Sequence, residues 1–214
     1  MSVTIRNATA EDMDQIMAVE ESWPEMARAP RDKFEARLEK YPQGFFVWEQ
    51  EGRILATITS MPYSYDPAKA ERFTNWDEVT NEGYLYEIGP KEDYNSLYIV
   101  SGIIDKDSRG GDIFERMVGT EVELARSLGY GYVIGGAVIP GYKRYCVKND
   151  AVPAHEYVFM KKGSRLIDPL LDMYQKIGFA APDAAHVVRE YFPDDASLNY
   201  AAIVVNKLGV SGFK

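Results

Sequence analysis

Alternating and periodic apolar positions divide the first part of the chain into short strands and amphipathic helices. Residues 3–7 alternate between apolar and polar side chains, which is typical of a half-buried strand. Thr9 is a suitable N-cap for a helix directly after this strand. Apolar side chains at spacings of four and three after Pro30 predict a second helix. The runs 45–49 and 53–61, joined by a turn that contains glycine, predict a β-hairpin.

Apolar runs and one long amphipathic helix dominate the second part of the chain. Two stretches, 62–95 and 140–167, lack clear periodicity and mix aromatic with polar residues, so we interpret them as insertions. The pattern as a whole predicts a mixed α/β (α+β) fold, with a central mixed sheet flanked by helices. The elements predicted in this part are strands at 97–104 and 132–139, helices at 113–128 and 169–177, and a last pair of strands at 185–191 and 199–206.

Length, charge and cysteine content limit the kinds of protein that this chain can be. Its 214 residues fit one domain, 1–214, that carries the two insertions. The net charge of −9 argues against a nucleic-acid partner, and it reflects either a solvated acidic surface or attraction of cationic substrates. A single cysteine excludes an internal disulfide, and two histidines make a metal site unexpected. No signal peptide or membrane-spanning run is recognisable, so we expect a cytoplasmic protein without a membrane partner.

A short turn that contains glycine, 108–114 (Ser-Arg-Gly-Gly-Asp-Ile-Phe), lies between the strand 97–104 and the helix 113–128. The free N–H groups at the start of a helix, together with the helix dipole, attract anions. Glycines in the turn allow the backbone to approach a ligand closely. The turn is therefore a candidate anion site, and a tight turn without a ligand is the alternative.

Three segments, taken together with the order of the elements, resemble the GNAT superfamily of acyl-CoA-dependent N-acyltransferases. They are residues 5–12 (Ile-Arg-Asn-Ala-Thr-Ala-Glu-Asp), residues 104–117 around the glycine turn, and residues 173–179 (Met-Tyr-Gln-Lys-Ile-Gly-Phe). The resemblance covers nearly the whole chain and implies a GNAT-like sheet. The stretches 139–142 and 191–200 are also similar to a GNAT subgroup that is found fused to nitrilase-like amidohydrolases.

The resemblance implies acetyl-CoA as the co-substrate and assigns residues to it. The backbone of Ile103 and Ile104 is expected to hydrogen-bond the pantetheine chain and the thioester oxygen. Tyr174 is implied as the general acid for the departing thiolate, since a phenol is protonated at neutral pH; a tyrosine of the hydrophobic core is the alternative. The residues of the turn expected to hold the pyrophosphate are Arg109, Gly110, Gly111, Asp112, Ile113 and Phe114.

Two residues of the turn depart from the family pattern. Asp112 stands where the family favours glycine, and Phe114 stands where it favours a small residue. Asp112 suits the helix dipole, but its carboxylate would repel a pyrophosphate if it turned inward. These departures favour a second hypothesis, a GNAT-like module that binds acyl-CoA or another ligand without turnover.

The two insertions are expected to form the acceptor pocket, because they adjoin the strands that bracket the predicted thioester position. Aromatic side chains with polar tips are usual in small-molecule sites. Cover for the sheet, or a contact in a homodimer, is the alternative. The residues predicted to bind the acceptor are Trp76, Tyr86, Tyr142 and His155. No single base stands out: the candidates are Glu82, Glu87, Asp93, His155 and Glu156, and water is an alternative.

Glu121 breaks the apolar arc of the helix 113–128. At 3.6 residues per turn its side chain falls among the apolar positions. A carboxyl there should be paired or have a raised pKa. One interpretation is a buried acid that orients a neighbouring strand or site, and the alternative is a glutamate that reaches the edge of the arc or forms a structural ion pair. The sequence as a whole favours an acyl-CoA-dependent N-acyltransferase, with direct acetyl transfer to a small-molecule amine.

Overall fold

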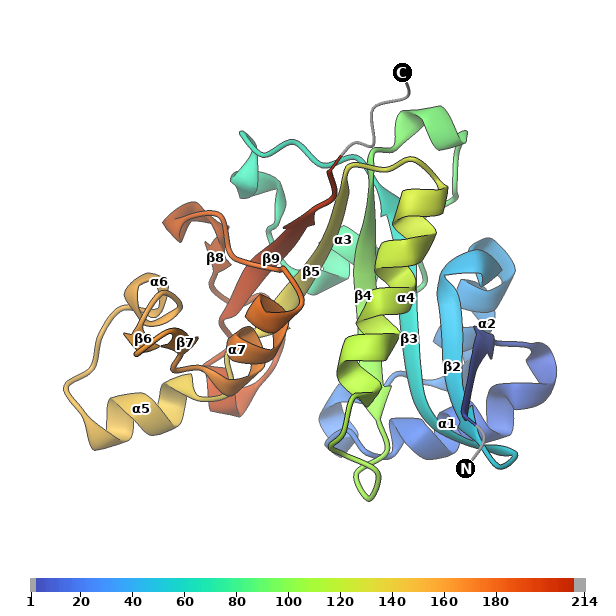
Figure 1. The fold of residues 1–214 in the computed structure, drawn as a ribbon, viewed down its shortest axis with the longest axis horizontal. Coiled ribbons are helices and arrows are strands. Elements are labelled where there is room, and N and C mark those ends of the chain that lie inside the picture. The colour runs from blue at the N-terminus through green and yellow to red at the C-terminus, as the bar shows by residue number, and fades with distance from the viewer. Residues whose placement is uncertain (1–2, 210–214) are drawn as a thin grey trace. The chain divides into compact units, whose positions relative to one another are not determined.

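The computed structural model describes residues 3–209 as a mixed α+β fold with a seven-stranded mixed sheet and flanking helices (Figure 1). The described residues fall into two compact units. The first unit comprises 3–64, 80–133 and 208–209, and the second comprises 65–79 and 134–207.

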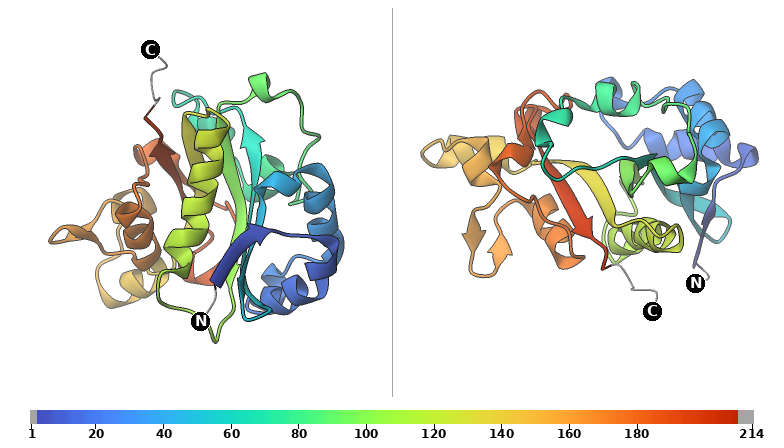
Figure 2. Two further views of the ribbon diagram at one scale, coloured as in Figure 1. Left: turned by 45° about the vertical axis from the view of Figure 1, so that its right-hand side comes forward. Right: turned by 90° about the horizontal axis from the view of Figure 1, so that it is seen from above.

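Four antiparallel strands form the sheet of the first unit, in chain order. Helices cover it on both faces: α1 and α2 lie on one face and α4 runs along the other (Figure 2). The elements are β1 (Val3–Asn7), β2 (Phe45–Gln50), β3 (Arg53–Tyr63), β4 (Ser96–Ile104), α1 (Met13–Glu20), α2 (Arg31–Lys40) and α4 (Ile113–Ser127). Short 3-10 helices lie at Ala10–Asp12, Glu25–Ala27, Pro42–Gly44 and Lys91–Asp93.

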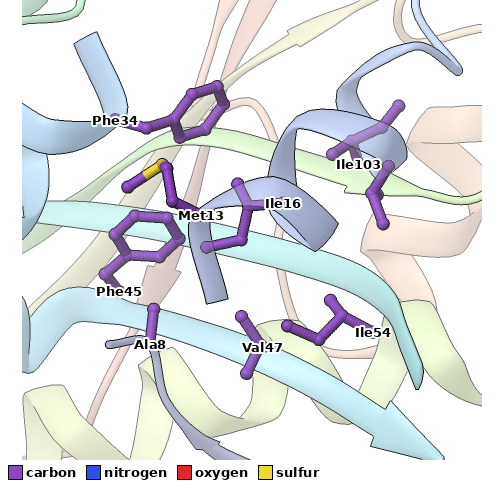
Figure 3. Close-up of a cluster of buried hydrophobic side chains, with 9 residues drawn as sticks. Ala8, Met13, Ile16, Phe34, Phe45, Val47, Ile54 and Ile103 are labelled. Carbon is purple, nitrogen blue, oxygen red and sulfur yellow. The ribbon is translucent and has the colours of Figure 1, made fainter. Parts of the chain in front are cut away.

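A hydrophobic cluster joins α1 and α2 to their face of the sheet (Figure 3). Ile16 of α1 is fully buried, and the ring of Phe34 on α2 lies 6.0 Å from that of Phe45 on β2. Val47 of β2 and Ile103 of β4 complete the contact from the sheet. Burial of a large aliphatic or aromatic side chain contributes about 1.5–3 kcal/mol. This cluster therefore fixes the two helices against β4.

Asp12 caps the N-terminus of the first helical segment. The backbone N–H of Thr9 donates to Asp12 Oδ2 at 2.8 Å, as in a capping box. The guanidinium of Arg6 on β1 binds both oxygens of the same carboxylate, at 2.6 and 2.7 Å. This Arg6 pair holds the pKa of Asp12 at about 2.

The second unit contains most of β5 and the strands β8 and β9, in the order β5-β9-β8. Its elements are β5 (Tyr132–Val138), α5 (Tyr142–Lys148), α6 (Ala154–Tyr157), β6 (Lys161–Lys162), β7 (Arg165–Leu166), α7 (Pro169–Lys176), β8 (Val187–Val188) and β9 (Ala201–Lys207). Most of α3 (Trp76–Thr80) and the 3-10 helices Ala70–Arg72, Ala184–His186 and Asp195–Ser197 also belong here.

Two of the differences from the predicted boundaries affect the insertion and the last pair of strands. The first insertion begins later than residue 62, because β3 continues through Tyr63, which pairs with Ser96 of β4. The predicted strand 185–191 is mostly irregular: Asp183 accepts the N–H of Ala185 and starts a 3-10 turn, and only β8 is extended. A local side-chain hydrogen bond competes here with strand pairing.

Asp168 organises the second insertion from the start of α7. Asp168 is the N-cap, and its Oδ1 accepts the N–H groups of Leu170 and Leu171 at 3.0 and 3.2 Å. Its Oδ2 accepts the N–H of Gly141 at 3.0 Å and the hydroxyl of Tyr157 at 3.2 Å. Burial raises the pKa of Asp168, and these four donors oppose that rise. One carboxylate thus links α5, α6 and α7.

Replacing Asp168 with alanine should lower the free energy of unfolding by about 2 kcal/mol, from the lost N-cap and the donors left unpaired. Urea denaturation followed by far-UV circular dichroism measures the loss. Asp172→Ala on the same helix is the matched control, because Asp172 pairs with the largely exposed cations Arg165 and Lys176. Equal losses from the two variants would contradict the organising role of Asp168.

Candidate anion-binding site at the start of α4

The turn between β4 and α4 is tied together by Asp105, directly after the strand. Its N–H continues the sheet by donating to Leu55 O at 2.8 Å. Its carboxylate accepts the hydroxyl of Ser108 at 3.1 Å and pairs with Arg53 at 3.0 Å. Its carbonyl accepts the N–H of Ser108 at 2.9 Å. The side chain of Asp105 therefore holds the turn in a defined shape.

Gly110 and Gly111 supply the backbone conformations that the turn requires. Their φ angles are +120° and +64°, in the region that favours glycine. A Cβ atom at either position would meet no heavy atom within 4 Å. Space beside this backbone is therefore open, as close approach of a ligand requires.

The helix start that follows has no side-chain cap from its N-cap residue. Asp112 is the N-cap residue but makes no side-chain capping bond. Its carboxylate, 70% exposed, instead lies 4.0 Å from Nη1 of Arg116, one helical turn later. The guanidinium of Arg116 lies over the ring of Trp48 at 4.5 Å. Asp112, whose carboxylate would repel a pyrophosphate if it turned inward, is thus directed toward Arg116, a cation on its own helix.

Cationic side chains surround the turn in a chain that is acidic overall. Lys106, Arg109 and Arg116 are exposed there. The backbone N–H of Lys106 donates to Ser22 Oγ at 3.0 Å, and Nη2 of Arg109 donates to Ser22 O at 3.3 Å. These contacts anchor the turn to the segment after α1. Asp105, Asp107, Asp112 and Glu115 lie in the same segment, so an anion here would have to be held by the backbone of the turn and by individual cations and not by an excess of positive charge.

The predicted pantetheine residues end β4, beside a break in its alternation. Ile103 is buried against α1 and α2, Ile104 is half-buried, and Gly102, between Ser101 and Ile103, is exposed. The pairing of β3 with β4 shifts between Thr59 and Ser60, which makes Val100 an extra, bulged residue. The exposed Gly102 makes this part of β4 accessible from the surface.

Glu121 of α4 is buried, as its place in the apolar arc predicts. Its side chain is 0% exposed, and Oε2 accepts the hydroxyl of Ser60 at 2.7 Å. Its Oε1 has no hydrogen-bond partner among the described residues. Burial raises the pKa of Glu121 to about 8, and the Ser60 bond opposes this rise. The interpretation of a buried acid that contacts a neighbouring strand is therefore confirmed, because Glu121 is buried, bonds Ser60 of β3 and forms no salt bridge within the described residues.

Tyr174 lies on α7 in the second unit. Its side chain is buried, and its ring meets that of Phe179 at 5.4 Å and 63°. Burial raises the pKa of Tyr174 to about 12. The phenol therefore stays protonated across the neutral range, as a general acid requires. The same burial suits a core tyrosine, so both hypotheses remain.

The four predicted acceptor residues do not share one unit. Tyr86, 52% exposed, belongs to the first unit, and the other three belong to the second. Trp76 begins α3, where its N–H donates to Tyr191 O at 2.8 Å and its ring meets Phe192 edge-on. The hydroxyl of Tyr142 donates to Val152 O at 2.8 Å. His155 is exposed on α6. The acceptor role of these residues stays a prediction.

Arg37 and Asp105 are important residues that the sequence reasoning missed. Arg37 lies three residues after Phe34 and falls within the apolar stripe of α2, yet it is only 1% exposed. The periodicity test that found Glu121 would also have found Arg37. Asp105 carries no comparable signal, because an acid directly after a strand is common in turns.

The sequence analysis also did not identify His186, a buried histidine that joins two segments of the second unit. His186 Nδ1 lies 2.8 Å from Asp183 Oδ1, and its Nε2 lies 3.3 Å from the hydroxyl of Tyr65. His186 is 1% exposed. These bonds hold the start of the first insertion against the 3-10 turn 184–186.

Residues 3–209 contain neither a metal-binding group of side chains nor a membrane-spanning helix. No group of three or more His, Cys, Asp or Glu side chains gathers there in a way that could hold a metal ion. No helix in the same residues combines the length and the apolar character needed to cross a membrane.

Comparison with known proteins places this geometry in context. No model of a known protein family matches the chain. It is 29% identical over 204 residues to the probable hydrolase YhcX of Bacillus subtilis. That match covers 94% of the chain but 38% of the relative, so the chain spans well under half of that protein's length. It is also 25% identical over 208 residues to the uncharacterized N-acetyltransferase YkwB of the same organism, covering 95% of the chain and 88% of the relative.

Two solved structures share the fold over nearly their whole length. The loading GNATL domain of CurA from Lyngbya majuscula superposes with a TM-score of 0.80 at 20% identity, covering 97% of this chain and 98% of that one. The GphF GNAT-like decarboxylase, solved with isobutyryl-CoA, superposes with a TM-score of 0.79 at 23% identity, covering 95% and 98%. The order of the elements, the turn before α4 and these superpositions agree, and the chain has the fold of the GNAT superfamily.

Proposed function

We propose that this protein is an acyl-CoA-dependent N-acyltransferase that moves an acetyl group from acetyl-CoA to a small-molecule amine. The observation that carries the proposal is the turn before α4. It combines two positive-φ glycines beside open space, a helix start without a side-chain cap, and an Asp112 carboxylate directed toward Arg116. The similarity to YkwB and the isobutyryl-CoA in GphF support the same cofactor class.

In this proposal the chain contributes binding, orientation and a proton. The turn 109–114 holds the pyrophosphate through backbone N–H groups, with Lys106 and Arg109 nearby. The backbone of Ile103 and Ile104 holds the pantetheine and the thioester oxygen. The neutral amine attacks the thioester carbonyl, the C–S bond breaks, and Tyr174 protonates the thiolate.

Acetyl-CoA should raise the melting temperature of the wild-type protein, because a ligand that binds the native state stabilises it. Gly111→Val should abolish the rise, since a β-branched residue is strained at φ +64° and blocks the approach of the ligand. Differential scanning fluorimetry measures both effects. Gly163→Val is the matched control: Gly163 has φ +66° and equally open surroundings, but lies in the β6–β7 turn.

The control variant should keep the full acetyl-CoA shift even if its own melting temperature falls. No shift in the wild-type protein at millimolar acetyl-CoA would exclude the proposed function. A shift without release of free CoA thiol, across a broad panel of amines, would favour a binding module without turnover.

Decarboxylation of a carboxylated acyl-CoA is a second candidate. The observation that favours it is the higher TM-score to the GphF decarboxylase, 0.79, than to the S18-alanine N-acetyltransferase of Escherichia coli, 0.60. In that reaction the C–CO₂ bond breaks, CO₂ leaves, and the α-carbon takes up a proton while the thioester survives. Malonyl-CoA would then yield acetyl-CoA without free thiol, and mass spectrometry separates the two reactions.

A further inference from the structure

A buried cation in the first unit has no acidic partner in contact with it. The Arg37 side chain of α2 is 1% exposed and forms no salt bridge within residues 3–209. Glu20 is near enough to act on it electrostatically, but Oε1 of Glu20 accepts the N–H of Ala29 at 2.8 Å. Burial lowers the pKa of Arg37 to about 10, so the guanidinium is still charged at neutral pH. An unpaired buried charge is costly, which calls for an explanation.

The hydrogen bonds of Arg37 leave one end of the guanidinium unused. Nε donates to Gly83 O at 2.8 Å, and Nη1 donates to Ser101 Oγ at 2.9 Å. Nη2 is buried and has no partner among the described residues. The hydroxyls of Ser101 and Thr59 are bonded to each other at 3.0 Å. The cation therefore polarises two hydroxyls and keeps unused donor capacity.

Ser101 connects this buried charge to an accessible part of β4. Ser101 is itself half-buried, so the residue that bonds Arg37 is partly accessible. Ser101 faces the same side of the sheet as Ile103, two positions later, which is a distance of roughly 7 Å along a strand. Ile103 is one of the residues expected to hold the pantetheine. A group bound at Ser101 would thus lie close to the reacting thioester.

We propose that Arg37 and Ser101 form a recognition site for a carboxylate carried by one of the two reactants. The proposal rests on the proposed acyl-CoA function and narrows its substrate class. A carboxylate oxygen can accept a charge-assisted hydrogen bond from Nη2, the unused end of the guanidinium, whereas the phosphates of CoA are expected beyond Ile104, at the turn. The carboxylate belongs either to an amino-acid acceptor or to the far end of the acyl group.

A purely structural role for Arg37 makes a different prediction. The residue also ties the segment after α3 to α2, through Gly83, while Lys40 donates to Leu85 O nearby at 3.0 Å. If this were its whole role, its loss would lower stability and would affect carboxylate and neutral substrates equally. A comparison of matched substrates therefore separates the two roles.

The test uses the full chain and two arms of matched substrates. One arm compares amino acids with their carboxamides as acceptors for acetyl-CoA, and the other compares malonyl-CoA with propionyl-CoA. A third measurement, independent of turnover, records the further rise in melting temperature that sodium malonate gives to the acetyl-CoA complex, against sodium chloride of equal ionic strength. The variants are Arg37→Gln, Ser101→Ala and the control Thr120→Ala, whose hydroxyl bonds only within α4.

We expect the wild-type protein to prefer the carboxylate member of one arm by tenfold or more in kcat/KM, and to respond to malonate. Arg37→Gln and Ser101→Ala should reduce both the preference and the malonate response at least fivefold, while Thr120→Ala keeps them. The arm that responds identifies the reactant that carries the carboxylate. Ser101→Ala, which leaves Arg37 in place, decides the matter if Arg37→Gln does not fold.

Two outcomes would overturn the inference and leave the proposed function standing. One is turnover of acetyl-CoA with no carboxylate preference in either arm and no malonate response. The other is an equal loss for both members of each pair in the two variants. Absence of acetyl-CoA binding would instead overturn the proposed function, and the inference with it.

Discussion

Tyr174→Phe should lower kcat by about 10²- to 10⁴-fold, the usual cost of removing a general acid. The affinity for acetyl-CoA should change little, because only the hydroxyl is lost and the ring contact with Phe179 remains. The pKa of about 12 adds a second expectation. Loss of rate through ionisation of this phenol should not occur below about pH 11. Steady-state kinetics, with acetyl-CoA affinity measured separately, checks the first expectation, and a pH–rate profile checks the second.

Tyr145→Phe is the matched control for this experiment. Tyr145 lies in the same unit, and its ring packs against Tyr157 at 5.4 Å. Its hydroxyl has no role in the proposed reaction, so kcat should stay close to the wild-type value. If Tyr174→Phe keeps its kcat and only changes the melting temperature, Tyr174 is a core residue and the proton must come from another group or from water.

Glu121→Gln should stabilise the protein at alkaline pH, by several kcal/mol at pH 8 and above. The pKa of Glu121 is about 8 in the folded state against an ordinary value of 4.5. Below pH 4.5 the carboxyl is protonated in both the folded and the unfolded chain, so its ionisation does not change the free energy of unfolding. Between the two values the unfolded chain releases the proton and the folded chain keeps it. The free energy of unfolding then falls by about 1.4 kcal/mol per pH unit.

Chemical denaturation of both proteins from pH 5 to pH 9 measures this difference. The stability of Glu121→Gln should lack the decline with pH that this residue causes, and the two curves should meet near pH 4.5. Tyr41 interacts electrostatically with Glu121 and with Tyr130, and both tyrosines have raised pKa values, so they stay neutral over this range. Glu123→Gln, an exposed residue on the same helix, is the control. Parallel pH curves for wild type and Glu121→Gln would contradict a buried acid that keeps its proton.

Sequence periodicity was sufficient for the elements that carry the candidate site. The strand 97–104 and the helix 113–128 were predicted to within one residue at each end, because their apolar runs are long and their boundaries are marked by turn residues. The short strand β8 was not predicted correctly, because two extended residues after a capped 3-10 turn are too few to show a pattern of alternating polarity. Such short strands are determined by pairing with distant residues, and the local sequence pattern carries no information about that pairing.

The bulge at Val100 explains why the sequence could not identify Ser101. Strict alternation would place Ile99 and Ser101 on one face of the strand. In the structure Ile99 pairs with Ser60 and Ser101 pairs with Thr59, which face opposite sides of the sheet. Only the register of β3 against β4 reveals that Ser101 meets Arg37. The buried acid Glu121, in contrast, was predictable because a helix keeps its period.

The bonds of Asp105 within the turn before α4 have a consequence for the rate and strength of ligand binding. Because Asp105 holds Ser108, the conformational entropy of ordering this loop is lost when the chain folds. Under the proposed function, a phosphate would meet a loop that is already ordered, and binding would require little further ordering. Preorganisation of this kind would let an acidic protein capture a highly charged cofactor with a short loop.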